Sequence, residues 1–237
     1  MKAKIILTIV YLVLLVVLLS LSHWQWRRAE QKQQWLQQRE VALQAEPVDL
    51  SAIGAKYQES LCYRKTKLNG YYDTDHQFLL DNQISEGKAG YYVLTPLKLI
   101  NSNKAVLVNR GWIPLPVNRI ELPILPATNL RINAEGRIND FPTVAIKLKD
   151  AEIPTANWPS IVQLVDVTVL SKKLGYPLLD FQVELDEHEP DGFKRTWQIA
   201  TVMQPEQHIG YALQWLALAL TLTALYIGYG FIKKHND

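Results

Sequence analysis

The chain has 237 residues, of which 48% are hydrophobic and 20% charged, and its formal net charge is +2. A charge so close to neutral excludes a strongly basic nucleic-acid-binding protein, and a single cysteine, Cys62, excludes a disulfide framework or a cysteine-based metal site. The mean hydropathy of -0.06 would suit a soluble globule, but it averages two uncharged apolar ends with a charged, turn-rich middle. We therefore expect a membrane protein.

The first apolar segment, residues 5–26, carries no formal charge. As a helix it would extend roughly 33 Å, enough to cross a hydrocarbon core of about 30 Å. A cleavable signal peptide is the alternative, because residues 1–4 are basic and Ser20-Leu21-Ser22 resembles a cleavage site. The apolar run is longer than a signal sequence needs, so we predict a transmembrane helix that follows a cytoplasmic N-terminus at residues 1–4. No organelle-type presequence precedes it, which favours a bacterial protein.

Residues 27–46 are polar, contain neither glycine nor proline, and are rich in good helix formers. We predict that they continue the first helix out of the membrane as a juxtamembrane helix, which Pro47 ends.

The middle of the chain, residues 47–207, has the pattern of a β-rich domain. Short β-type runs alternate with turn signals such as Asn69-Gly70, Glu86-Gly87 and Asp191-Gly192. Predicted strands lie at residues 63–68, 77–80, 91–97, 105–108, 130–138, 181–185 and 194–201. One helix is predicted at residues 167–174, with Asp166 as its N-cap and Gly175 as its C-cap. The expected fold class is α+β: an antiparallel β-barrel or sandwich with a short helical insertion.

The second apolar segment predicts a transmembrane helix at residues 208–232, followed by a cytoplasmic C-terminus at residues 233–237. Six residues fall at alternating steps of four and three, so a helix would place them in one stripe, most of whose members are small: Gly210, Gln214, Ala217, Thr221, Ala224 and Gly228. Such a stripe admits a second helix at close range. We favour packing against the first transmembrane helix; a docking face for another protein is the alternative.

His208 is the residue whose chemistry stands out. It heads the second apolar segment and shares a helix face with Tyr211 and Trp215, where a half-dehydrated imidazole can bind a metal or haem iron. His23 lies at the matching end of the first segment. The alternative is that both are ordinary interface histidines, which physical chemistry alone favours.

The remaining polar motifs give weaker predictions. Arg110-Gly111-Trp112 could clamp a carboxylate and stack on a flat partner, or could simply form a bulge with a packed aromatic side chain. The acidic run at residues 184–191 fits no defined metal spacing and is expected to be a hairpin loop. No phosphate-binding loop, nucleophile elbow or paired zinc-binding histidines occur in the sequence, so we do not expect an enzyme.

Three blocks carry a family resemblance: Gly90-Tyr-Tyr-Val-Leu-Thr-Pro96, Val108-Asn-Arg-Gly-Trp-Ile-Pro114 and His208-Ile-Gly-Tyr-Ala-Leu-Gln-Trp215. Together with Trp24-Gln25, Arg28 and Lys32, and in this order between two apolar segments, they resemble the surfeit locus protein 1 family of cytochrome c oxidase assembly factors in its bacterial form. The resemblance covers nearly the whole chain.

The resemblance implies a two-pass protein of the bacterial inner membrane with a periplasmic central domain. The charges alone leave the orientation open, because basic residues occur both at the termini and beside the central domain. The implied role is to aid haem a insertion into subunit I of the oxidase, with His208 at the position of the family histidine. Expected partners are subunit I, other assembly factors and the lipid bilayer. A scaffold that binds only protein, without a cofactor, is the alternative.

Two groups of residues are candidate partner contacts, whether the protein aids haem a insertion or acts as a scaffold without a cofactor: the stripe on the second segment, and the pair Arg110 and Trp112. The sequence departs from the family at Ser22, where the family usually has glycine, and lacks an expected methionine in the helix after Asp166. His23 occupies a position that varies in the family, so the resemblance does not support it as a ligand.

Overall fold

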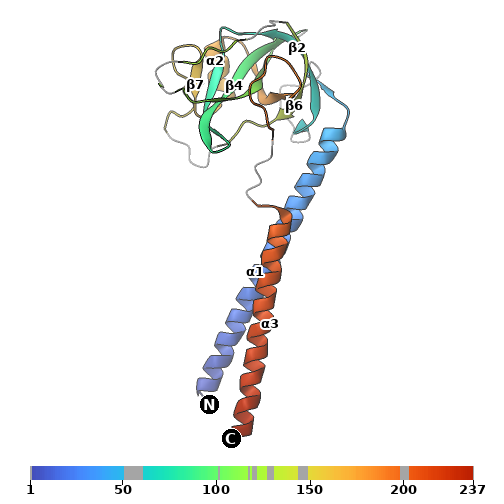
Figure 1. Ribbon diagram of the computed structural model, residues 1–237, viewed down its shortest axis with the longest axis vertical. Coiled ribbons are helices and arrows are strands. Elements are labelled where there is room, and N and C mark those ends of the chain that lie inside the picture. The colour runs from blue at the N-terminus through green and yellow to red at the C-terminus, as the bar shows by residue number, and fades with distance from the viewer. Residues whose placement is uncertain are drawn as a thin grey trace. The chain divides into compact units, whose positions relative to one another are not determined.

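The computed structural model describes residues 2–50, 61–100, 102–116, 118, 122–126, 131–143, 149–197 and 203–236, apart from the side chains of residues 3 and 231–236. The chain divides into two compact units. One contains Met1–Gln38 and Ile199–Asp237, and the other contains Arg39–Gln198. Each unit is described by itself below (Figure 1).

The first unit is a pair of antiparallel helices, α1 (Lys2–Gln44) and α3 (Pro205–Asn236). The antiparallel direction follows from their contacts, since Tyr11 bonds to Thr223 whereas Gln25 bonds to His208. The predicted continuation of the first helix beyond residue 26 is confirmed, because α1 runs unbroken to Gln44. It ends three residues before Pro47, which fits the helix-ending role of proline.

The second unit is built on one sheet of eight strands: β1 (Val48–Asp49), β2 (Lys65–Tyr72), β3 (Phe78–Ser85), β4 (Lys88–Leu99), β5 (Ala105–Pro114), β6 (Arg131–Asn139), β7 (Ser160–Val162) and β8 (Leu178–Leu185). Their order is β1-β2-β6-β8-β5-β4-β3-β7, and β2 also pairs with β4. This extra pairing joins β2, β6, β8, β5 and β4 into a hydrogen-bonded ring of five strands (Figure 1).

The prediction of a β-rich domain is confirmed, but the prediction of a purely antiparallel sheet is wrong. β5 and β8 run parallel, as do β1 and β2, and β3 and β7. A long connection that includes α2 separates β5 from β8, and a connection of that length can bring two strands together in either direction. β1 and β7 have two and three residues, too few to show a period in the sequence.

Two other sequence predictions differ from the structure. Of the predicted strand at residues 194–201, Lys194 forms an isolated bridge to Trp112, and residues 198–201 lie outside the described residues. Asn69-Gly70 was predicted as a turn but lies inside β2. A Cβ atom on Gly70 would overlap the carbonyl oxygen of Lys98 on β4, so glycine is needed here for the close approach of two strands.

Local signals in the sequence predicted other features correctly. The turn at Glu86-Gly87 joins β3 to β4, with φ angles of 50° and 74°. The helix α2 (Val167–Leu174) has the predicted bounds. Its N-cap Asp166 accepts hydrogen bonds from the backbone nitrogens of Thr168 and Val169, and Gly175 ends the helix at a φ of 79°.

The domain has a main core inside the ring, a second core under α2 and a smaller third cluster around Tyr91. All five strands of the ring contribute side chains to the main core, with Leu68, Leu97, Val108, Ile138 and Phe181 fully buried. Leu170 of α2 belongs to the second core, together with Phe78 and Leu94. The opposite faces of β2 and β6 alternate with these buried positions and are largely exposed.

Asp73, directly after β2, is a buried carboxylate whose side chain is 8% exposed. Burial alone would raise its pKa. Hydrogen bonds from Lys98, Tyr176 and His76 outweigh that effect, and the pKa of Asp73 lies below its ordinary value of 3.8.

We therefore expect Asp73 to stabilise the domain above about pH 4 and to lose this contribution as the pH falls through its lowered pKa. The measurement is urea unfolding of the detergent-solubilised chain between about pH 3 and pH 7. Asp73→Asn should lower the free energy of unfolding at neutral pH and flatten its decline in acid. Parallel pH profiles for the two proteins would show that the hydrogen bonds to this carboxylate contribute nothing.

Candidate functional site

The two helices of the first unit meet along one continuous line of side chains, here called the helix seam. Its positions recur at steps of three and four and are half-buried or buried: Thr8, Tyr11, Leu15, Leu18, Ser22, Gln25 and Ala29 on α1, and His208, Ala212, Trp215, Ala219, Leu222 and Tyr226 on α3. This is the spacing of a coiled coil, in which small and large side chains interlock.

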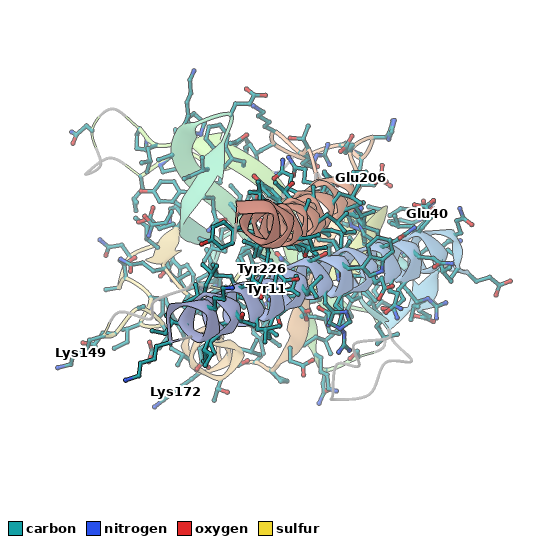
Figure 2. All side chains as sticks on the ribbon, turned by 90° about the horizontal axis from the view of Figure 1, so that it is seen from below. Tyr11, Glu40, Lys149, Lys172, Glu206 and Tyr226 are labelled. Atoms are coloured by element: carbon teal, nitrogen blue, oxygen red, sulfur yellow. The ribbon has the colours of Figure 1, made fainter. Side chains whose placement is uncertain are left out.

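One end of the helix seam is held by two tyrosines. The rings of Tyr11 and Tyr226 stack with centroids 4.1 Å apart and planes only 5° from parallel (Figure 2). The Tyr226 hydroxyl lies 2.7 Å from the Thr8 hydroxyl, and the Tyr11 hydroxyl donates to Thr223 over 3.2 Å. These contacts satisfy polar groups inside an apolar stretch, so they also set the register of the two helices.

The other end of the helix seam contains His208. Its Nδ1 lies 2.7 Å from Oε1 of Gln25, and one turn away Ser22 donates to the backbone oxygen of Ala212 over 2.9 Å. An amide oxygen can only accept, so Nδ1 carries the hydrogen, and in the neutral form of such a ring the lone pair lies on Nε2. Among the described residues nothing forms a hydrogen bond to Nε2. The site therefore offers one oriented imidazole nitrogen that is able to bind a metal ion.

Of the other predicted ligand-site residues, Tyr211 and Trp215, only Trp215 lies in the helix seam. Tyr211 is 45% exposed, whereas Trp215 is half-buried against α1. His23 is exposed and lies one residue past Ser22, off the line that carries Gln25. Within the described parts of the chain no hydrogen bond or ring contact joins His23 to His208. The structure therefore brings Gln25, which we did not single out as a site residue, to the imidazole in place of His23.

The favoured interpretation of the small-residue stripe was wrong. The stripe is almost wholly exposed, and a Cβ atom on Gly210 or Gly228 would meet nothing within 4 Å. α1 packs on the opposite face of α3, where Ala212 and Ala219 are each 2% exposed. The small residues of the true contact face alternate with large ones, so they form no stripe. Three polar residues in the apolar part of α1, at positions 8, 11 and 22, lie on the contact face and form hydrogen bonds to α3, whereas Ser20 is exposed.

Replacement of Ala212 or Ala219 by leucine should push α1 and α3 apart, because each alanine is buried at the contact. We expect the pairing to weaken by about 1–3 kcal/mol. Ala217→Leu, the matched control on the exposed face, should leave it unchanged. Cysteine crosslinking between positions 18 and 215 would report the pairing, and equal loss in the control would contradict the assigned face.

Arg110 and Trp112, the other predicted partner contacts, are interior groups that are 1% and 7% exposed. The sheet register shifts between Tyr92 and Leu94, opposite Arg110 and Gly111, and Gly111 has a φ of 113°. The alternative interpretation of this motif, a bulge with a packed aromatic side chain, therefore describes it. Neither side chain has the exposure that contact with a partner requires.

Residues 186–191 of the acidic run form a surface loop, whereas its first residues, Glu184 and Leu185, are buried at the end of β8. Arg195 donates hydrogen bonds to the backbone oxygens of Asp186, Glu187 and Glu189 and so holds the shape of the loop. In the part of the chain that the structure describes, no group of three or more histidine, cysteine or acidic side chains could hold a metal ion. A pocket of about 520 Å³ lies beside β1, β2 and β6, and its described lining includes none of the predicted site residues.

Comparison with known proteins places these features in a family. The family model described as "SURF1 family" matches residues 12–220. A SURF1-like protein of Rickettsia felis is 28% identical over 227 residues, which cover 93% of this chain and 95% of the relative. "Surfeit locus protein 1" of Arabidopsis thaliana is 24% identical over 257 residues, covering 86% of this chain and 72% of the relative. The protein of that name from Rattus norvegicus is 22% identical, covering 87% and 70%.

Proposed function

Because the chain belongs to the SURF1 family, we propose that it is an assembly factor for haem-copper cytochrome c oxidase that aids haem a insertion into subunit I. The observation that carries this proposal is the imidazole of His208, whose Nδ1 is held by Gln25 and whose Nε2 has no hydrogen-bond partner among the described residues. We propose that the protein acts by binding and presenting its cargo, without catalysing a reaction.

Both helices are long and apolar enough to cross a membrane. Their pairing leaves most apolar side chains exposed, including Ile9 at 54%, Val13 at 57% and Leu220 at 64%. Apolar surface of this extent is unfavourable in water, and a bilayer would cover it. From Lys4 to Gln25, α1 rises roughly 32 Å, which matches the hydrocarbon thickness.

The exposed aromatic side chains support the same placement. Trp24 and Trp26 are about half exposed and flank Gln25, and Tyr211 lies one turn from His208. Both helices therefore carry aromatic residues at the level of the Gln25–His208 contact, where a membrane interface favours them. In this arrangement His208 lies at the outer surface of the bacterial inner membrane, and the β-rich domain is periplasmic.

The periplasmic location predicts the accessibility of an introduced cysteine. His188 is a suitable position because its side chain is 94% exposed on the surface loop. In a Cys62→Ser background, His188→Cys should react with a membrane-impermeant thiol reagent in spheroplasts, and a cysteine at Lys2 should react only after lysis. The reverse pattern would contradict the orientation.

The residues around His208 suit haem a. Bound haem a would supply an iron atom that accepts a nitrogen donor, and His208 would provide Nε2. Tyr211 offers exposed aromatic surface beside it. Arg28 and Lys32, one and two turns beyond Gln25 on α1, offer cations to the propionate groups. Imidazole, aromatic surface and cations together match a carboxylate-bearing apolar ring.

The exposed stripe of α3 suits a helix of subunit I as its partner. Gln214, one of the residues of this stripe, has an exposed polar side chain in the apolar helix. A polar amide that faced lipid would be unfavourable, so Gln214 favours a protein neighbour on this face. The same stripe would serve a scaffold that binds oxidase subunits without haem, which is the second candidate function.

The test is the haem a content of the oxidase in cells that express His208→Ala at wild-type levels. We expect a loss of haem a from subunit I, with the variant still in the membrane. His23→Ala, the matched histidine control on the exposed face, should behave as wild type. Normal oxidase in His208→Ala, combined with defective oxidase in Ala217→Leu, would favour the cofactor-free scaffold.

A further inference from the structure

We infer that Gln25 is a positioning residue for His208: its amide oxygen fixes the tautomer and the orientation of the imidazole, so that Nε2 is presented to the iron of a bound haem. This inference rests on the proposed function and deepens it. It begins from the 2.7 Å contact between Gln25 Oε1 and His208 Nδ1, which joins residues 183 positions apart in the sequence.

The surroundings make this hydrogen bond effective. Gln25 and His208 are both half-buried, so water competes for the bond less than at an exposed site. One turn along each helix, the bond from Ser22 to the Ala212 backbone fixes the separation of the helices. In the helix seam, the Gln25–His208 contact lies next to the Ser22–Ala212 contact. The packing of the two helices therefore holds the amide at the imidazole.

The hydrogen bond determines which ring nitrogen is available. A neutral imidazole exchanges its hydrogen between Nδ1 and Nε2, and only the nitrogen without the hydrogen can bind iron. Acceptance by Gln25 holds the hydrogen on Nδ1 and leaves the lone pair on Nε2. A hydrogen-bonded Nδ1–H also makes Nε2 a stronger donor to a metal, which is the usual role of the acceptor behind a metal-bound histidine.

The first experiment uses the full chain in detergent, without haem, labelled with ¹⁵N-histidine. The wild type should show the Nδ1–H tautomer for His208, identified by the loss of its signal in His208→Ala. Gln25→Leu should give a mixture of tautomers. A pure Nδ1–H tautomer in Gln25→Leu would overturn the inference without any haem measurement.

The second experiment titrates the same proteins with haem a and follows the Soret band and the reduction potential of the bound haem. We expect Gln25→Leu to weaken binding about 10- to 100-fold, the usual effect of removing such an acceptor. Gln25→Glu, which keeps an acceptor, should retain wild-type affinity within a few-fold and lower the reduction potential. The matched control is Gln33→Leu, an exposed glutamine on α1 that lies off the helix seam.

The outcomes separate the inference from the proposed function. A wild-type Soret band that depends on His208, with affinity and potential unchanged in Gln25→Leu, would overturn the role of Gln25 alone. The absence of a His208-dependent band in the wild type would overturn the proposed function and this inference with it.

Discussion

Replacement of Arg110 by methionine should destabilise the β-rich domain by about 3–5 kcal/mol, because several neutral acceptors depend on this one buried guanidinium. The guanidinium donates to the backbone oxygens of Asp191 and Pro126, over 2.7 and 2.6 Å, and to the side-chain oxygen of Gln77 over 3.1 Å. The rings of Tyr72 and Phe193 lie 5.6 and 5.0 Å from its central carbon. One side chain thus joins three segments that are distant in the sequence.

The size of the effect follows from what methionine would leave behind. Arg110 is 1% exposed, so its charge is largely removed from water, and this burial lowers its pKa from the usual value. Without the guanidinium, two partly buried carbonyl groups lose this donor, the Gln77 amide oxygen keeps only the hydrogen bond from Thr95, and each unsatisfied group costs about 1–3 kcal/mol. Lysine would not replace arginine here. The three nitrogens of the planar guanidinium each reach a different acceptor, and a single ammonium group cannot reach all three.

Urea unfolding followed by tryptophan fluorescence would measure the loss in Arg110→Met. Arg131→Met is the matched control, since Arg131 is an exposed residue on β6. The control should change the free energy of unfolding by less than about 0.5 kcal/mol. A similar small change in Arg110→Met would contradict the role assigned to the buried guanidinium.

The second large effect is expected for Gly70→Ala. The new methyl group would overlap the backbone oxygen of Lys98, and a backbone atom cannot move aside without breaking the β2–β4 pairing that closes the ring of strands. We expect a loss of about 3 kcal/mol or more, at the upper end for overpacking. The same unfolding assay would measure this loss.

Gly87→Ala provides the control for Gly70→Ala. Gly87 has a φ of 74°, but a methyl group there would enter open space. The replacement should cost roughly 1 kcal/mol, the penalty of a left-handed conformation for a residue with a side chain. If Gly70→Ala were the milder of the two, the close approach of β2 to β4 would not be the reason for glycine at position 70.

Features determined by neighbouring residues could be predicted from the sequence. Helix α2 is the clearest case, because Asp166 and Gly175 cap it through contacts within a few residues. The β3–β4 turn at Glu86-Gly87 is another. In both, the hydrogen bonds or backbone angles that decide the structure belong to the motif itself.

Features determined by distant partners could not be predicted in this way. Asn69-Gly70 has the composition of a turn, but the oxygen of Lys98 across the sheet is what requires the glycine. The small-residue stripe of α3 satisfies a general rule for helix packing, yet the tyrosines and Gln25 on α1 determine which face is used. His208 could be identified as a candidate from its position and the family resemblance. Its acceptor Gln25 required the structure.

The most direct test of the account is whether haem a binds through the imidazole at position 208. Purified wild-type chain titrated with haem a should give a saturable Soret band at one haem per chain, His208→Gly should lose it, and free imidazole should restore it by entering the space that the side chain leaves. A band that persists unchanged in His208→Gly without imidazole would contradict the assignment of Nε2 as the haem ligand.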